Sequence, residues 1–155
     1  TTSQYTSQAF NAGATSASGV ELEVALGRPQ GPRLQGNLTA QDTRDRGDDP
    51  VYRGRDLPYL PEFEAALEAA LPLGPWRLGV GWQHQAAAYR DRYNSAADRI
   101  PVRTLWNVSV ARAWRRAGRA LTASLEIVNL TDADVYDVAG FPLPGRSFRA
   151  GLNLD

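Results

Sequence analysis

The sequence predicts an all-β chain, an antiparallel, up-and-down transmembrane β-barrel segment of about seven strands. Apolar and polar residues alternate with a period of two over runs of roughly ten to fifteen residues, whereas strands of soluble proteins average about five or six. A tilted barrel strand needs about nine to eleven residues to cross the hydrocarbon. Short and long connections also alternate along the chain, as in barrels with tight periplasmic turns and long extracellular loops.

The individual strands follow from this alternation, which places successive side chains on opposite faces of a sheet. In the stretch from 120 to 130, for example, Leu121 and Leu125 alternate with Thr122 and Glu126. The same pattern predicts strands over 19–26, 34–41, 76–88, 100–114, 120–130 and 146–155. The predicted connections are short at 27–33, 72–75 and 115–119 and long at 42–56, 89–99 and 131–145.

The segment 57–71 fits two templates. Pro61 followed by alanine, leucine and glutamate is typical of an amphipathic helix, and propensity alone favours that reading. However, Phe63, Leu67 and Leu71 also belong to an unbroken alternating series that includes the alanines at 65 and 69. Because the neighbouring segments are strands, the segment is predicted to be a strand.

Composition narrows the possible functions. The chain has no cysteine and a single histidine, which leaves no thiolate metal site and no multi-histidine zinc site. All 17 basic residues are arginine, so a Schiff-base lysine and a P-loop lysine are absent. The formal net charge is zero, which argues against a nucleic-acid-binding surface. The charged segment 42–56 predicts a solvated loop, and its spacing fits no EF-hand calcium loop. The alternative is an arginine-rich rim that contacts an anionic substrate or lipopolysaccharide.

Two groups of residues resemble one protein family. These residues are Asn129, Leu130, Thr131 and Asp132, then Gly140, Phe141, Pro142, Pro144, Gly145 and Arg146, with Asn11, Gly19, Val20 and Glu21 near the start. With them the sequence looks like the C-terminal part of the β-barrel of a TonB-dependent outer-membrane receptor, in which an Asn-Leu-Thr-Asp-like motif ends the penultimate strand and a Gly-x-Pro-x-Pro-Gly-Arg-like run leads into the last.

The resemblance implies a location in the outer membrane of a Gram-negative bacterium and a role in energised uptake of a scarce substrate, such as an iron-siderophore or cobalamin. It implies no enzymatic activity, no cofactor and no nucleic-acid partner. The partners would be outer-membrane lipid, the remainder of the barrel and its plug, a TonB-type energy-coupling protein and the small-molecule substrate. Residues 1–155 would then be the C-terminal portion of the receptor barrel, with the plug domain and the signal peptide absent from this chain.

The predicted site residues fall into two sets, and neither is catalytic or metal-binding. Polar residues on the wet faces of strands are possible lumen-lining residues, although each alone fits an unspecialised wet interior: Glu21, Glu23, Arg77, Arg103, Glu126 and Arg149. Aromatic residues near the connections are expected to form girdles at the two membrane interfaces: Trp76 and Trp114 at the short turns, Tyr59 and Tyr89 near the long loops.

Three further residues have an expected local role, and two other function classes stay open. Asn129, Thr131 and Asp132 are expected to hydrogen-bond nearby backbone at a strand end. His84 is expected to be a structural or interfacial residue. A small porin- or adhesin-like outer-membrane barrel, and a soluble β-domain with binding activity, are the alternatives to the receptor segment.

Overall fold

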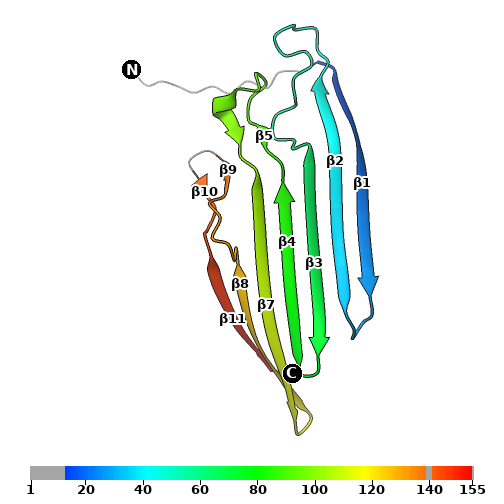
Figure 1. Cartoon of the computed structure of the whole chain (residues 1–155), viewed down its shortest axis with the longest axis vertical. Helices are drawn as coiled ribbons and strands as arrows, with labels where there is room; N and C mark the ends of the chain where they lie inside the picture. Colours follow the sequence, from blue (N-terminus) through cyan, green and yellow to red (C-terminus); the bar gives the residue numbers. More distant parts are fainter. Residues whose placement is uncertain (1–12, 139–140, 155) are drawn as a thin grey trace.

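The computed structural model describes residues 13–138 and 141–154. Seven strands form one antiparallel sheet in the order β1-β2-β3-β4-β7-β8-β11, with each strand beside its neighbour along the chain (Figure 1). This confirms the predicted all-β, antiparallel, up-and-down architecture. The strands of the sheet are β1 Thr15–Gly27, β2 Arg33–Asp45, β3 Phe63–Leu73, β4 Trp76–Gln85, β7 Arg103–Arg116, β8 Arg119–Val128 and β11 Ser147–Leu154.

Four very short strands lie in the long loops and form two separate ribbons. They are β5 Ala88–Tyr89 with β6 Arg99–Ile100, and β9 Tyr136–Val138 with β10 Phe141–Pro142. A 3-10 turn, η1 Ala96–Asp98, precedes β6. Within the described residues, no helix is long and apolar enough to cross a membrane.

The ambiguous segment is a strand, as predicted. β3 runs from Phe63 to Leu73 and pairs with β2 on one side and β4 on the other. The segment forms a strand despite its high helix propensity, because a helix would leave the facing backbone groups of β2 and β4 without partners. Unpaired backbone groups away from water are costly. The strand also starts later than expected, since residues 57–62 belong to the preceding loop.

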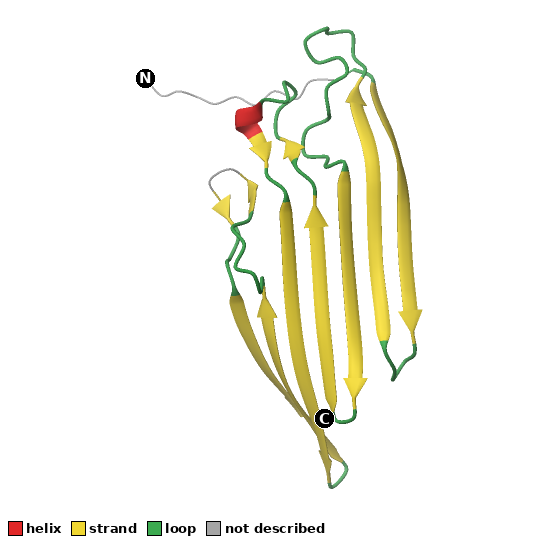
Figure 2. Cartoon of the chain, in the orientation of Figure 1, coloured by secondary structure: helices red, strands yellow, loops and turns green. Residues whose placement is uncertain are grey.

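Short turns lie at one end of the sheet and long loops at the other (Figure 2). In the turn between β7 and β8, Ala117 and Gly118 both have positive φ, as a tight two-residue hairpin requires. The long loops run over 46–62, 86–102 and 129–146, so the first begins four residues later than the predicted loop 42–56. The reason is that β1 and β2 continue to pair as far as Thr15 opposite Asp45.

The sheet has one apolar and one polar face. Paired positions such as Val80 opposite Val108, and Val110 opposite Leu125, define the apolar face. This face is not covered by protein: the exposed fraction is 67% for Val20, 44% for Val80 and 46% for Leu125. Among the described residues, the buried apolar side chains are those of Pro61, Ala88 and Val135, and all three lie at the loop end outside the large sheet. A sheet with a bare apolar face fits lipid contact, not the core of a sandwich.

The apolar face has the height of a membrane. On β4 it extends from Trp76 to His84, eight steps of about 3.4 Å, or about 27 Å along the strand. Tilted by about 40°, this distance corresponds to about 21 Å along the membrane normal, close to the apolar band of about 25 Å in outer-membrane barrels. Above this band, β2 carries the charged residues Asp42 and Arg44 at outward positions, so the loop end projects into water.

Candidate functional site

The predicted lumen-lining residues all lie on the polar face, opposite the apolar face. Glu126 and Arg149 are directly opposite each other on β8 and β11, and their charged atoms are 3.4 Å apart. Both side chains are well exposed, so the pair contributes only about 0.5 kcal/mol. The other four residues are not brought together but are distributed over three strands: Glu21 and Glu23 on β1, Arg77 on β4 and Arg103 on β7. That this face lines a lumen stays a prediction.

A shallow groove of about 350 Å³ crosses the polar face from β2 to β8. Its floor is made of small residues, Ala70, Gly79 and Gly81, and carboxylates stand on either side of them, Glu68 on β3 and Glu126 on β8. Gly79 has a steric reason to be glycine, because an added Cβ would lie 2.3 Å from Ser109 Oγ. The groove therefore offers polar side chains around an accessible stretch of backbone.

Above the polar face, a partly buried ion pair joins the end of β2 to the second long loop. Asp45, the last residue of β2, is 2% exposed, and its Oδ2 accepts hydrogen bonds from Arg92 Nη2 at 2.5 Å and Nε at 3.2 Å. Its Oδ1 accepts a third bond from the Gly47 amide at 2.9 Å. These donors favour the ionised carboxylate, and the bond from Arg92 contributes most to lowering the pKa of Asp45.

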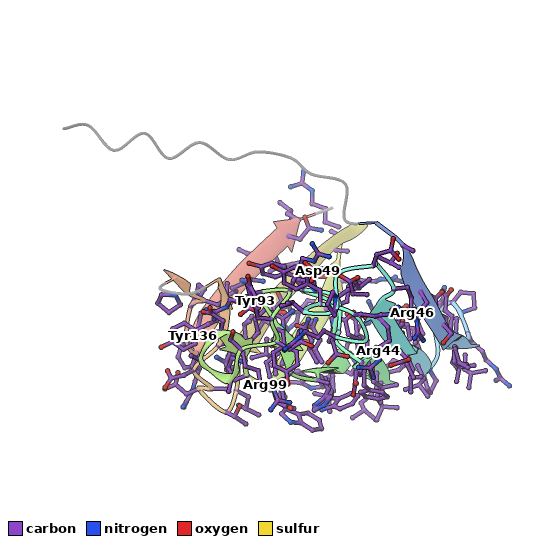
Figure 3. All side chains as sticks on the ribbon, turned by 90° about the horizontal axis from the view of Figure 1, so that it is seen from above. Arg44, Arg46, Asp49, Tyr93, Arg99 and Tyr136 are labelled. Atoms are coloured by element: carbon purple, nitrogen blue, oxygen red, sulfur yellow. The ribbon has the colours of Figure 1, made fainter. Side chains whose placement is uncertain are left out.

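Aromatic rings extend this link. The Arg92 guanidinium lies 4.2 Å from the centre of the Tyr52 ring, and Tyr52 contacts Tyr93 edge to face at 5.0 Å. The Tyr52 hydroxyl donates to the Tyr93 hydroxyl at 2.8 Å, and losing that proton would break the bond, so the pKa of Tyr52 is raised. Figure 3, which looks down onto the loop end, shows Tyr93 and Arg99 among the side chains gathered above the strands.

Asn94 makes a third connection between these loops, through backbone groups. Its Oδ1 accepts from the Asp56 amide at 2.8 Å, and its Nδ2 donates to the Asp56 carbonyl at 3.0 Å. Arg55 also donates to the Tyr93 carbonyl oxygen. Loops 46–62 and 86–102 are thus held together as one unit, which we call the loop platform, defined by Asp45, Tyr52, Asp56, Arg92 and Asn94.

Three carboxylates at the edge of the loop platform lie close enough to hold a cation, with ligand atoms within 4.8 Å of one another: Asp42, Asp56 and Glu62. Arg44 already supplies the positive charge. Its guanidinium pairs with Asp42 at 2.5 Å, with Glu62 at 3.8 Å and with Asp56. The cluster is therefore an ion-pair network centred on an arginine.

The motif residues at the end of β8 form a compact turn. Asn129 is 2% exposed with φ of 54°, and its side chain both accepts from the Ala133 amide and donates to the Ala133 carbonyl, each at 2.9 Å. Asp132 Oδ1 accepts from the Arg146 amide at 2.7 Å and so ties the start of the third long loop to its end. The side chains of Asn129 and Asp132 thus bond backbone at a strand end. Asn11 and Gly140 of the motifs lie outside the described residues.

The predicted girdle residues lie at both ends of the strands. Trp76 begins β4 beside a short turn, and Trp114 lies near the turn end of β7. Tyr59 and Tyr89 are in the loop region, where the Tyr59 amide donates to the Tyr89 carbonyl at 2.7 Å. Their membership of a girdle stays a prediction.

Sequence reasoning missed a second aromatic group, which lies on the apolar face near the loop end. Trp82 is opposite Trp106, with ring centres 6.3 Å apart. His84 stacks on Trp82 at 5.9 Å and bonds Thr104 Oγ1 through Nδ1 at 2.8 Å. The available signal was the even spacing of Trp82, His84 and Trp106 on the apolar phase of their strands.

Comparisons with known proteins agree with this geometry. Residues 1–130 match the family described as TonB dependent receptor-like, beta-barrel. The comparison with curated proteins gives no match. Among solved structures, 31 chains match.

Three of these structures are a receptor and two transporters. BauA, the ferric preacinetobactin receptor from Acinetobacter baumannii, matches with a TM-score of 0.75 at 18% identity over 90% of this chain. The ferric citrate transporter FecA in its unliganded form matches with a TM-score of 0.66 at 19% identity over 80% of this chain. The copper transporter OprC matches with a TM-score of 0.60 at 21% identity over 86% of this chain. The chain spans 22%, 21% and 22% of those three chains, respectively. At these identities the likeness shows the fold.

Proposed function

The chain belongs to the TonB-dependent receptor-like β-barrel family of Gram-negative outer-membrane proteins, and from this premise we propose that it forms the C-terminal portion of the barrel wall of a receptor for energised uptake. The substrate proposed is a scarce one, an iron-siderophore or cobalamin. The chain would work with the remainder of the barrel, a plug and a TonB-type energy-coupling protein. It would act as a receptor wall and carry out no chemical reaction.

One observation carries the proposal: a single sheet has an apolar face about as tall as the apolar band of a bilayer, a polar face with a small-residue groove, and a loop platform at one end. In the proposed receptor, the apolar face would meet lipid, the polar face would face inward and the loop platform would stand above the membrane. A transporter wall needs these three surfaces, because substrate must be met outside, pass along a wet path and be kept from the hydrocarbon.

The loop platform supports a receptor in preference to an open pore. Its two loops come from different hairpins, yet a partly buried ion pair, a tyrosine pair and a two-bond amide link hold them together. Ordering loops has an entropic cost of about 1–2 kcal/mol per residue, which the contacts within the platform offset. Preorganised loops reduce the cost of binding a ligand, so a fixed rim suits recognition better than diffusion.

The test is uptake by cells that lack the gene, with and without the full-length receptor. We expect the receptor to restore uptake of either a labelled ferric-siderophore or labelled cobalamin, and a protonophore to abolish that uptake, because transport is energised. A matched variant with Asn94→Ala and Arg92→Gln, which removes the ion pair and the amide link between the loops, should bind substrate more weakly. Unselective uptake of small solutes that persists with the protonophore would contradict the proposal and favour a porin.

A further inference from the structure

Arg112 is a charged residue on the apolar face. It lies on β7 between Val110 and Trp114 of the same phase, opposite Trp76 on β4 and Ala123 on β8. A charge on a lipid-facing position is costly, by roughly 2–4 kcal/mol at the midplane and falling toward zero at the interfaces. A role in the transport path would not explain this arginine, because that path would run along the opposite, polar face.

The surroundings of Arg112 hold its guanidinium in place but leave it without a counter-charge. The guanidinium carbon lies 4.9 Å from the Trp76 ring centre and 5.1 Å from that of Trp114, so the group sits between two indoles. Within the described residues the side chain makes no ion pair and no hydrogen bond, and its Nε is buried without a partner. Cation–π contacts orient the plane of the group, and its terminal nitrogens keep their capacity to donate.

A hollow of about 230 Å³ lies beside the guanidinium. The small side chain of Ala123 makes room for it, while Val110 and Leu125 line the side that continues into the apolar band. A polar head at Arg112 would thus lie next to the exposed apolar surface of the wall. This combination matches an amphiphile with an anionic head and an acyl chain.

The level of Arg112 in the membrane fits the same ligand. Its partner Trp76 is the first residue of β4 after the short turn, and the Ala113 amide donates to the Pro75 carbonyl of that turn at 2.9 Å. Short turns of outer-membrane barrels face the periplasm. Tryptophans mark the headgroup level, and planar guanidinium groups are well suited to phosphate.

We infer that Arg112, Trp76, Trp114 and the hollow over Ala123 form a binding site for one phospholipid of the periplasmic leaflet, whose headgroup phosphate is received by the guanidinium. The site would fix the wall to the membrane at the level of the short turns. It is independent of the transport path, since all of its side chains lie on the apolar face and none lines the polar groove.

The experiment is native mass spectrometry of the purified full-length receptor with phosphatidylglycerol and, as the phosphate-free probe, diacylglycerol with the same acyl chains. We expect the wild type to retain phosphatidylglycerol in preference to diacylglycerol. Arg112→Gln should retain about fivefold less, the loss expected for one basic residue at a membrane surface. Arg77→Gln is the matched control, because Arg77 lies at nearly the same level on the polar face, and it should retain lipid as the wild type does.

A second variant keeps the inference testable if Arg112→Gln folds poorly. Ala123→Leu leaves the arginine in place and fills the hollow, so it should also lose phosphatidylglycerol. Only receptor that keeps its folded mobility in unheated SDS gels is analysed. Equal retention of phosphatidylglycerol by the wild type and Arg112→Gln, equal retention of the two lipids by the wild type, or full retention by Ala123→Leu would each overturn the assignment.

Discussion

Replacing Asn129 tests how the third long loop is attached to the barrel wall. In Asn129→Ala, the two hydrogen bonds to Ala133 are lost, at about 1 kcal/mol each. The φ of 54° adds a further cost of about 1 kcal/mol, because alanine tolerates this left-handed conformation poorly. We therefore expect the turn to lose about 3 kcal/mol. Asn129→Gly loses the bonds but has no conformational penalty, so its cost should be about 2 kcal/mol.

Hydrogen–deuterium exchange of the full-length receptor measures this local opening, because amides of the turn exchange when it opens. Since each 1.4 kcal/mol is a factor of ten, the peptide that contains Leu130 and Ala133 should exchange about 150-fold faster in Asn129→Ala and about 30-fold faster in Asn129→Gly. Asn129→Asp keeps the acceptor for the Ala133 amide and should show the smallest change.

Exchange in the β1–β2 hairpin serves as the internal reference and should not change. Equal acceleration by alanine and glycine would refute the contribution of the backbone conformation. Unchanged exchange in all three variants would refute the view that this side chain holds the turn.

Two further predictions concern the groove floor and the loop platform. Gly79→Ala should destabilise the barrel by about 1 kcal/mol through the clash with Ser109 Oγ, whereas Gly81→Ala, whose Cβ would make ordinary contacts, should not. The temperature at which each variant loses its folded gel mobility measures both effects. If adding Ser109→Ala failed to restore the stability of Gly79→Ala, the steric explanation would be contradicted. Because the pKa of Asp45 is lowered in the folded protein, the ionised carboxylate stabilises the fold fully above the ordinary aspartate pKa of about 3.9. This stabilisation is lost as the pH falls through the lower pKa that Asp45 has in the folded protein. Limited proteolysis of loop 46–62 should therefore accelerate in acid, and Asp45→Asn should be cleaved readily even at neutral pH; equal resistance of wild type and Asp45→Asn at neutral pH would contradict a locking role.

The sheet could be predicted because its main determinant, the alternation of apolar and polar residues with a period of two, can be recognised from the sequence alone. Phe63 to Leu71 illustrates this: helix propensity was strong, yet the period of two agreed with the paired neighbours and prevailed. The end of β2 was missed for the same kind of reason. Charged residues from Asp42 onward suggested a loop, but antiparallel pairing with β1 continues above the apolar band. There both faces of the sheet are in water, so the alternation of polar and apolar side chains no longer distinguishes a strand from a loop.

The loop platform could not be predicted, because nothing in the sequence pairs side chains of different loops. Asp45 and Arg92 are 47 positions apart and belong to separate hairpins, so only the folded sheet brings them together. Arg112 left a fainter signal, since it interrupts an apolar alternation between Val110 and Trp114. Its significance depends on the two flanking indoles, one of which is on another strand.

The central claim, that one face of this sheet meets lipid and the other a wet interior, is most directly tested at two adjacent positions of β7. Val108 is mid-strand on the apolar face and Asn107 is on the polar face. Nitroxide labels attached at Val108→Cys and Asn107→Cys, each in full-length receptor in lipid vesicles, report collisions with apolar oxygen and with a polar nickel complex. We expect the label at 108 to be accessible to oxygen and shielded from nickel, and the label at 107 to lack this lipid signature. Identical accessibility at the two positions, or a label at 108 that is buried from both reagents, would contradict the account.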